Sequence, residues 1–146
     1  MEFINRVVNA VVHLHPWHAL IVHFPVALTA VGVLFIFLAL WLRSERYEHF
    51  AFLNMVLVAI STAVAGLVGL RDHFVRFGGE TPYVNVKIFL GSTLLLLALV
   101  TALARYRKPE LLWSGSSRIL YVAAYVGGFL LATVLGFIGG VILYGF

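Results

Sequence analysis

The sequence predicts an all-α membrane protein: a four-transmembrane-helix bundle preceded by an N-terminal amphipathic helix that lies in the membrane interface. Of its 146 residues, 62% are hydrophobic and 11% are charged, whereas soluble domains average about 45–50% and about 25%. A soluble chain of this length could not bury so much apolar surface, so lipid must cover most of it. Four long apolar stretches each approach the roughly 20 helical residues that cross a bilayer.

Residues 1–17 are predicted to form the interfacial helix, because apolar residues recur there at helical spacing with polar residues between them. The apolar positions are Phe3, Ile4, Val7, Val8, Val11 and Val12. Pro16 ends this helix, and Trp17 is placed like an interfacial anchor. The alternative interpretation is a frayed terminus.

The four predicted transmembrane helices belong to one membrane domain, residues 1–146. They cover residues 18–42, 50–70, 87–104 and 118–144. Pro25 lies in the first turns of the first helix, where a missing N–H costs least. Residues 44–49 are expected to form a tight polar turn between the first two helices.

The last predicted helix carries a small-residue stripe, a row of Ala and Gly at intervals of four. It consists of Ala124, Gly128, Ala132, Gly136 and Gly140. Small residues let two helix backbones approach closely in a membrane. The stripe therefore predicts tight packing against another helix, either in the same chain or in a partner subunit.

Basic residues indicate the orientation. Four spans place both termini on one side of the membrane, called the N side below. The opposite side holds six basic residues and the N side four, and positive charge prefers the cytoplasm. We therefore expect a multi-pass protein of the bacterial inner membrane with both termini in the periplasm.

The topology gathers most of the histidines at the N side. Five of the six histidines lie there: His13, His15, His18, His23 and His73. Asp72, Asn85 and Lys87 lie on the same side. His23 lies about 7.5 Å deeper along the helix than His18 and about 140° around it. A titratable group at that depth is costly unless it is neutral and hydrogen-bonded or binds a cofactor. We expect His23 to point into the bundle, within reach of His73, Asn85 or Lys87.

Neutral imidazole is a common ligand for haem iron, zinc and copper. The candidate cofactor-binding residues are His23, His18, His73 and Lys87, and the candidate metal ligands are His18, His23 and His73. A bis-histidine haem would take one ligand from the first helix, with His73 the best second candidate. The alternative is that these histidines make protein hydrogen bonds and form a structural or docking corner, with His13 and His15 at the interface.

Several function classes are disfavoured. The sequence has no cysteine, which excludes iron–sulfur clusters and covalent c-type haem. It has no serine nucleophile elbow, phosphate-binding glycine loop or His-Glu-x-x-His run, so we do not expect an enzyme. The net charge of +4 comes from short loops and does not indicate nucleic-acid binding. The predicted spans carry no acidic residue, which argues against a proton-coupled transporter.

The segment His18-Ala-Leu-Ile-Val-His23-Phe-Pro25-Val-Ala-Leu28 resembles the opening motif of a bacterial four-span membrane family catalogued as domain of unknown function 2231. That motif reads His-Pro-x-x-Val-His-Phe-Pro-Ile-Ala-Leu. The closing segment Gly136-Phe-Ile-Gly139-Gly140-Val-Ile-Leu-Tyr144 is similar to the family's Gly-x-x-Gly-Gly-x-x-x-Tyr pattern. Two positions differ from the family pattern: Ala19 replaces a proline of the opening motif, and Lys87 stands where we would expect a histidine. Lys87 could instead hold an anionic lipid or a partner's carboxylate.

The resemblance implies a redox setting, beside c-type cytochromes and respiratory or photosynthetic components. We therefore expect a non-catalytic integral membrane subunit of a larger electron-transferring complex, whose histidine-rich corner binds a cofactor or docks a partner. Expected partners are the lipid bilayer, other membrane subunits and a periplasmic c-type cytochrome. The alternatives are a free-standing membrane redox protein that binds haem b, another macrocycle or a metal, and a small transporter.

Overall fold

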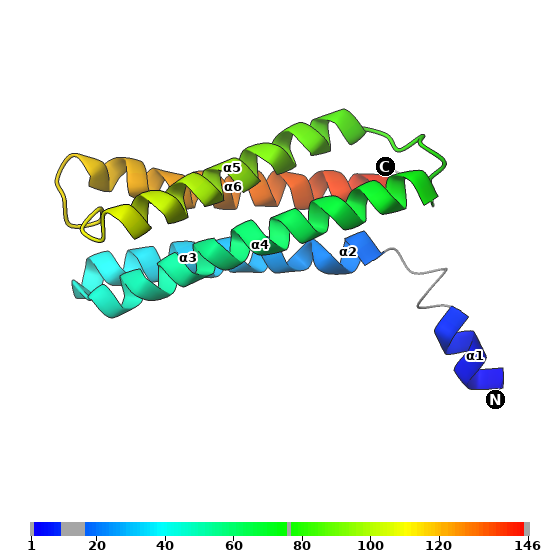
Figure 1. Ribbon diagram of the computed structural model, residues 1–146, viewed down its shortest axis with the longest axis horizontal. Coiled ribbons are helices and arrows are strands. Elements are labelled where there is room, and N and C mark those ends of the chain that lie inside the picture. The colour runs from blue at the N-terminus through cyan, green and yellow to red at the C-terminus, as the bar shows by residue number, and fades with distance from the viewer. Residues whose placement is uncertain (1, 10–16, 76, 145–146) are drawn as a thin grey trace.

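The computed structural model describes residues 2–9, 17–75 and 77–144. These residues form six helical segments and no strand (Figure 1). The segments are α1 (Glu2–Asn9), α2 (Trp17–Ile21), α3 (His23–Leu42), α4 (Glu45–Val75), α5 (Val84–Arg107) and α6 (Ser117–Tyr144). The predicted all-α class is confirmed.

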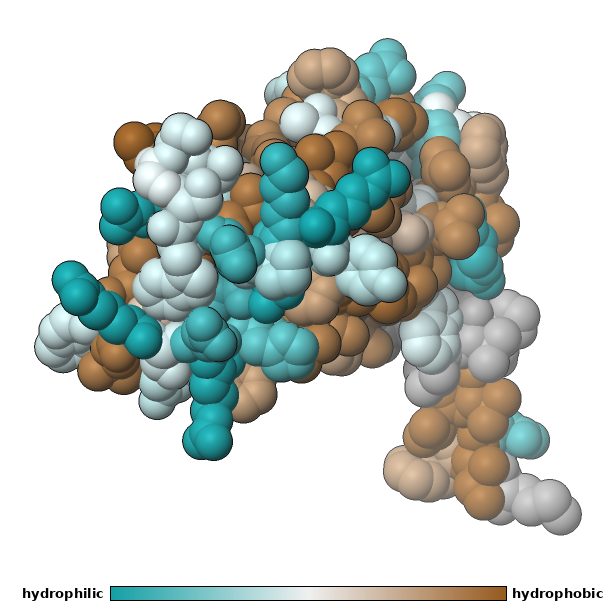
Figure 2. All heavy atoms as spheres, turned by 60° about the vertical axis from the view of Figure 1, so that its left-hand side comes forward, coloured by the Kyte–Doolittle hydropathy of each residue, from teal (hydrophilic) through white to brown (hydrophobic). Residues whose placement is uncertain are grey.

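Four apolar stretches are long enough to cross a membrane: α2 together with α3, then α4, α5 and α6. At most 33% of the residues in each apolar window are buried inside the protein. Most of each stretch therefore faces outward, where hydrocarbon rather than water has to cover it. Hydrophilic side chains gather at the end of the bundle where α3 and α5 finish (Figure 2). The chain is a multi-pass membrane protein.

The four long helices lie side by side as a ring, in which α4 and α6 each pack against both α3 and α5 (Figure 1). Their shared interior is an apolar cluster. Its members in the middle of the bundle include Ile36, Met55, Val58, Leu94, Ala98 and Ala132. Because this interior is apolar, the polar contacts between helices are concentrated towards the two ends.

The first span is interrupted at Val22, which separates α2 from α3. Pro25 has no N–H to give to the carbonyl of Ile21, so the regular hydrogen-bond pattern is broken one turn before it. The helical path continues across the break, because the Val22 N–H donates to His18 O at 3.0 Å and the Val26 N–H to Val22 O at 3.5 Å.

The second span is longer than the predicted residues 50–70. Helix α4 begins at Glu45, and the chain reverses just before it at Arg43, whose φ of 48° is left-handed. The expected turn at residues 44–49 is therefore mostly the first turn of α4. Glu48 and Asp72 lie inside α4 and are buried. Helix α4 as observed therefore carries a buried acidic residue near each end, where the predicted span 50–70 has none.

Helix α1 is amphipathic, as the spacing predicts, and Phe3, Ile4, Val7 and Val8 are all exposed. An i, i+4 ion pair joins Glu2 and Arg6 at 3.9 Å on its polar side. The predicted helix extends over residues 1–17, and His13 and His15 lie outside the described residues.

Candidate functional site

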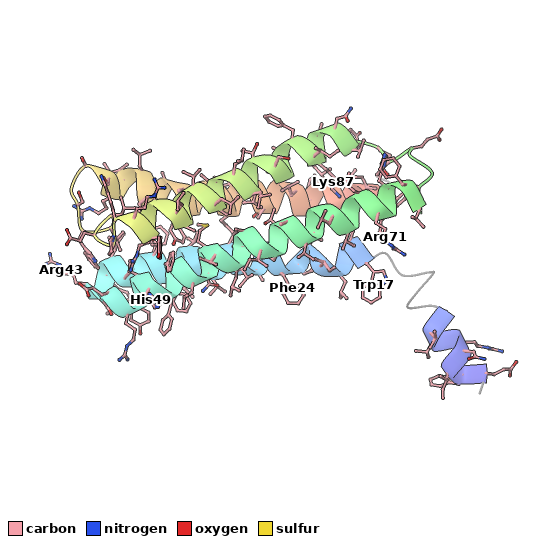
Figure 3. The ribbon with its side chains drawn as sticks, viewed as in Figure 1. Trp17, Phe24, Arg43, His49, Arg71 and Lys87 are labelled. Atoms are coloured by element: carbon pink, nitrogen blue, oxygen red, sulfur yellow. The ribbon has the colours of Figure 1, made fainter. Side chains whose placement is uncertain are left out.

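Three helices meet in a polar group at the N side, called the N-side cluster below. It consists of His18 on α2, Asp72 on α4 and Lys87 on α5. The His18 imidazole is the centre, because it has described contacts to both of the other helices. Figure 3 places Lys87 at this end of the bundle.

The hydrogen bonds of His18 define its protonation state. Nδ1 lies 2.9 Å from the carbonyl oxygen of Ala65. A carbonyl can only accept, so Nδ1 carries the proton. Nε2 lies 3.3 Å from Nζ of Lys87 and accepts a hydrogen bond from that amine. His18 is therefore neutral in this arrangement, and both of its ring nitrogens are occupied.

Gly69 makes room for this imidazole. A Cβ added at Gly69 would lie 2.8 Å from Nδ1 and 2.9 Å from Cε1 of His18, closer than van der Waals contact allows. The ring consequently lies directly against the backbone of α4, and any larger residue at this position would displace it. The sequence contains a matching pattern, since Ser61, Ala65 and Gly69 recur every four residues.

Asp72 holds the beginning of α2. Asp72 is buried, and its Oδ2 accepts a hydrogen bond from the backbone N–H of His18 at 3.1 Å. The first N–H groups of a helix have no partner inside the helix, and a carboxylate there is also favoured by the helix dipole. Oδ1 accepts from Nη1 of Arg71, also at 3.1 Å. The sequence predicts that Asp72 lies on the same side as the histidines, but not that it binds the backbone of α2.

The structure brings His18 and Lys87 together but leaves His23 and His73 apart from them. The expectation that His23 points into the bundle is wrong: its side chain is exposed, and no described residue makes a hydrogen bond to it. His73 instead forms a 2.7 Å hydrogen bond through Nδ1 with Oγ1 of Thr81, in the connection between α4 and α5. Asn85 is also exposed.

This geometry bears on the haem and metal interpretations. Among the described residues, no group of three or more His, Asp or Glu side chains is arranged to hold a metal ion. Neither ring nitrogen of His18 is available to an iron or zinc ion without breaking a protein hydrogen bond. In this structure the His18 ring is therefore held by protein hydrogen bonds on both sides.

A second polar group lies at the opposite end of the bundle, called the Glu48 cluster below. The Arg105 guanidinium binds both oxygens of Glu48, through Nε and Nη2, at 2.7 Å each. The hydroxyl of Tyr121 donates to Oε1 of Glu48 at 2.9 Å and lies 3.2 Å from the hydroxyl of Tyr125. The bidentate pair and the tyrosine together join α4, α5 and α6.

The Glu48 cluster is enclosed. The Glu48 side chain is 1% exposed and that of Arg105 16%, and the guanidinium also lies 5.2 Å from the ring centre of Phe52. The sequence does not reveal this cluster, because the polar residues 44–49 that contain Glu48 predict a turn. The cluster fixes three helix ends, and the described contacts occupy both carboxylate oxygens.

The family is shown by comparison with known proteins. Residues 14–146 match the family model described as "Predicted membrane protein (DUF2231)". The chain belongs to this family. This match confirms that the motifs in the first and last transmembrane helices are those of DUF2231. No curated protein and no solved structure matches the chain.

In this DUF2231 member the small-residue stripe of α6 faces its neighbours over part of its length. A Cβ at Gly128 would lie 3.8 Å from side-chain carbons of Leu94 and Leu97 on α5, and one at Gly136 3.7 Å from Val26 on α3. Ala132 between them is 1% exposed. Among the described residues, nothing lies within 4 Å of a Cβ added at Gly140.

Another glycine makes a closer contact between α3 and α6 than the glycines of the stripe do. A Cβ added at Gly32 on α3 would lie 3.3 Å from the ring of Tyr125. Tyr125 is 2% exposed and carries one of the hydroxyls of the Glu48 cluster. Gly32 therefore admits the ring whose hydroxyl contacts Tyr121.

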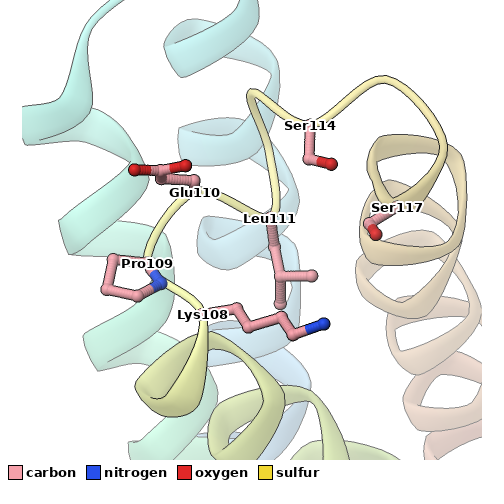
Figure 4. A pocket seen from close by; sticks show the side chains of 6 residues that line it. All are labelled: Lys108, Pro109, Glu110, Leu111, Ser114 and Ser117. Atoms are coloured by element: carbon pink, nitrogen blue, oxygen red, sulfur yellow. The ribbon is translucent and has the colours of Figure 1, made fainter.

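Two hollows on the described part of the DUF2231 chain are open and shallow. One, of about 210 Å³, lies in the connection between α5 and α6 and is bounded by Lys108, Pro109, Glu110, Leu111, Ser114 and Ser117 (Figure 4). All six are on that connection or the adjoining start of α6, so this hollow belongs to one loop rather than to a cavity between helices. A second hollow, beside Trp17, is considered below.

Proposed function

We propose that the chain is a non-catalytic integral membrane subunit of a larger electron-transferring complex in the bacterial inner membrane, with its termini in the periplasm. It contacts a partner subunit through the outer face of α3. The observation that carries this proposal is the exposed imidazole of His23, one turn and a half past His18 on a membrane-spanning helix.

The depth of His23 makes its exposure significant. It lies six residues beyond Trp17, where the span begins, which is about 9 Å along the helix. An unpaired polar group facing hydrocarbon costs several kcal/mol, and titratable side chains inside membranes usually have partners. Since no described residue of this chain bonds to His23, a group on another molecule is the natural partner.

The surface of α3 around His23 is suited to contact with another transmembrane helix rather than with lipid. Ala27 and Ala30 follow it by four and seven residues, so they share its face of α3, and both are exposed. Small residues allow a second helix to approach closely. Leu20 and Leu34 on the same face are bulky and exposed, like Leu96 and Leu103 on α5, so the small residues occupy the two turns that follow His23. We therefore assign the outer face of α3 to a partner transmembrane helix that carries a hydrogen-bonding side chain opposite His23.

The family resemblance supports the electron-transferring setting. It also suggests a periplasmic c-type cytochrome as a docking partner for the N side. The N-side cluster suits such a role, since its internal hydrogen bonds hold the ends of α2, α4 and α5 in fixed positions.

Site-specific cross-linking tests the assignment of α3. A photoreactive amino acid in place of Ala27 should form a discrete adduct with another membrane protein in native membranes. The same residue in place of Leu96 on α5 is the matched control and should label lipid. His23→Leu should lower the adduct yield at position 27, because the bond to the partner is lost. Lipid adducts alone at both positions would refute the proposed interface.

The electron-transferring setting needs its own measurement. The complex purified with a mild detergent should contain a redox-active subunit, seen as a change in visible absorption on reduction with dithionite. If a partner is cross-linked but the complex shows no redox-dependent absorption, the proposed interface on α3 stands and the electron-transferring role is refuted.

A further inference from the structure

A hollow with an almost wholly apolar lining lies between α2 and α4, and Arg71 is one of the residues that bound it. It has a volume of about 290 Å³ and is bounded by Trp17 and Ile21 on α2 and by Val68 and Arg71 on α4. Figure 3 shows Trp17 and Arg71 at the same end of the bundle, where the membrane span begins. Three of the four lining residues are apolar, and Arg71 supplies the one charge.

The position of Arg71 is set by the N-side cluster. Nη1 donates to Oδ1 of Asp72 at 3.1 Å, and the other Asp72 oxygen accepts from the backbone of His18. A guanidinium has five N–H donors in a planar fork, and this described contact uses one nitrogen. The Arg71 side chain is 51% exposed, while Asp72 is 7% exposed. An incoming anion therefore meets the guanidinium at the surface, with the carboxylate behind it.

We propose that this hollow binds an anionic phospholipid, with one acyl chain along Trp17, Ile21 and Val68 and the phosphate on Arg71. Trp17 to Ile21 is one helical turn, so the apolar lining runs from the interface towards the hydrocarbon. Arginine binds phosphate oxygens with two parallel hydrogen bonds. Basic pockets between transmembrane helices are known sites for anionic head groups. The site differs from the outer face of α3 and does not depend on a partner subunit.

Fluorescence quenching of Trp17 tests the site in the full chain. Trp41→Phe and Trp113→Phe leave Trp17 as the single tryptophan. The protein is reconstituted into phosphatidylcholine vesicles that contain a minor fraction of either brominated phosphatidylglycerol or brominated phosphatidylcholine. We expect an apparent preference of about fivefold for the anionic quencher, as for one basic residue near a charged lipid surface, and a smaller one at high salt.

Variants separate the head group from the acyl chain. Arg71→Gln should abolish the preference and Arg71→Lys should keep most of it. Arg118→Gln, at the other end of the bundle, should change nothing. Val68→Phe fills the hollow without altering any charge and should reduce quenching by the anionic lipid. Equal quenching by the two lipids in the parent chain, or an unchanged signal in Val68→Phe, would overturn the proposal.

Discussion

Gly69→Ala is the sharpest test of the N-side cluster. The added methyl group would lie 2.8 Å from Nδ1 and 2.9 Å from Cε1 of His18, so the imidazole has to move away from α4. That movement breaks the 2.9 Å hydrogen bond to Ala65 and the 3.3 Å bond from Lys87. The substitution therefore removes the centre of the cluster without changing any charge.

The expected change in the free energy of unfolding follows from the loss of these two hydrogen bonds. A neutral hydrogen bond contributes about 0.5–1.5 kcal/mol and one to a charged group about 1.5–3 kcal/mol. Alanine returns about 1 kcal/mol of helix propensity relative to glycine. The free energy of unfolding should therefore fall by roughly 1–3.5 kcal/mol.

Gly66→Ala is the matched control on the same helix. Nothing lies within 4 Å of a Cβ at Gly66, so the helix-propensity gain of up to about 1 kcal/mol is unopposed. Both variants can be unfolded by titrating mild-detergent micelles with sodium dodecyl sulfate while helicity is followed by circular dichroism. The two substitutions should change stability in opposite directions. If Gly69→Ala were as stable as Gly66→Ala, His18 would not lie against α4 as described.

Three further predictions concern other parts of the bundle. Glu48→Leu should lower the free energy of unfolding by about 3–5 kcal/mol, because it leaves the Arg105 charge buried and unpaired, and Glu48→Leu with Arg105→Leu should recover most of that loss. Gly136→Leu should disrupt folding or assembly, measured by size-exclusion chromatography, because a Cβ there already lies 3.7 Å from Val26. A periplasm-active reporter fused after Phe146 should be active in a bacterial host.

Each of these has a contrary result. Equal losses in the single and double Glu48 variants would mean that the pair acts through packing alone. Gly140→Leu is the control for Gly136→Leu, because no described residue lies within 4 Å of a Cβ added at Gly140. Equal disruption by both would show that the stripe contacts a partner rather than α3. A reporter active only in the cytoplasm would reverse the orientation.

The fold could be predicted from the sequence because lipid solvation demands long apolar helices. The predicted 118–144 helix is within a residue of α6 (Ser117–Tyr144) at each end. Helix α4 was harder, since its charged first turn resembles a polar turn by composition. In the structure this first turn is stabilised by the hydrogen bonds between Glu48 and Arg105, which lies 57 positions further along the chain. No local pattern reveals a pairing at that separation.

The inward position of His18 follows from helical geometry once the structure shows which face of α3 points into the bundle. The buried residues of α3 include Pro25, Thr29 and Gly32, which mark the face that points into the bundle. His18 lies seven residues before Pro25, and seven residues return a helix to within about 20° of the same face. His23 lies two residues before Pro25, about 200° away. Because five residues separate His18 and His23, only one of them can point into the bundle. His18 is the one that lies on the same helix face as Pro25.

Glu48 and Asp72 set a length scale for the whole molecule. They lie 24 positions apart on one helix, which is about 36 Å at 1.5 Å per residue. That length exceeds the roughly 30 Å hydrocarbon core but fits within the 40–45 Å that includes the head groups. A markedly thicker bilayer would draw one of these polar anchors into hydrocarbon, and a thinner one would leave apolar turns in water. Each ångström of such mismatch costs a fraction of a kcal/mol, so membrane thickness itself should select where this protein resides.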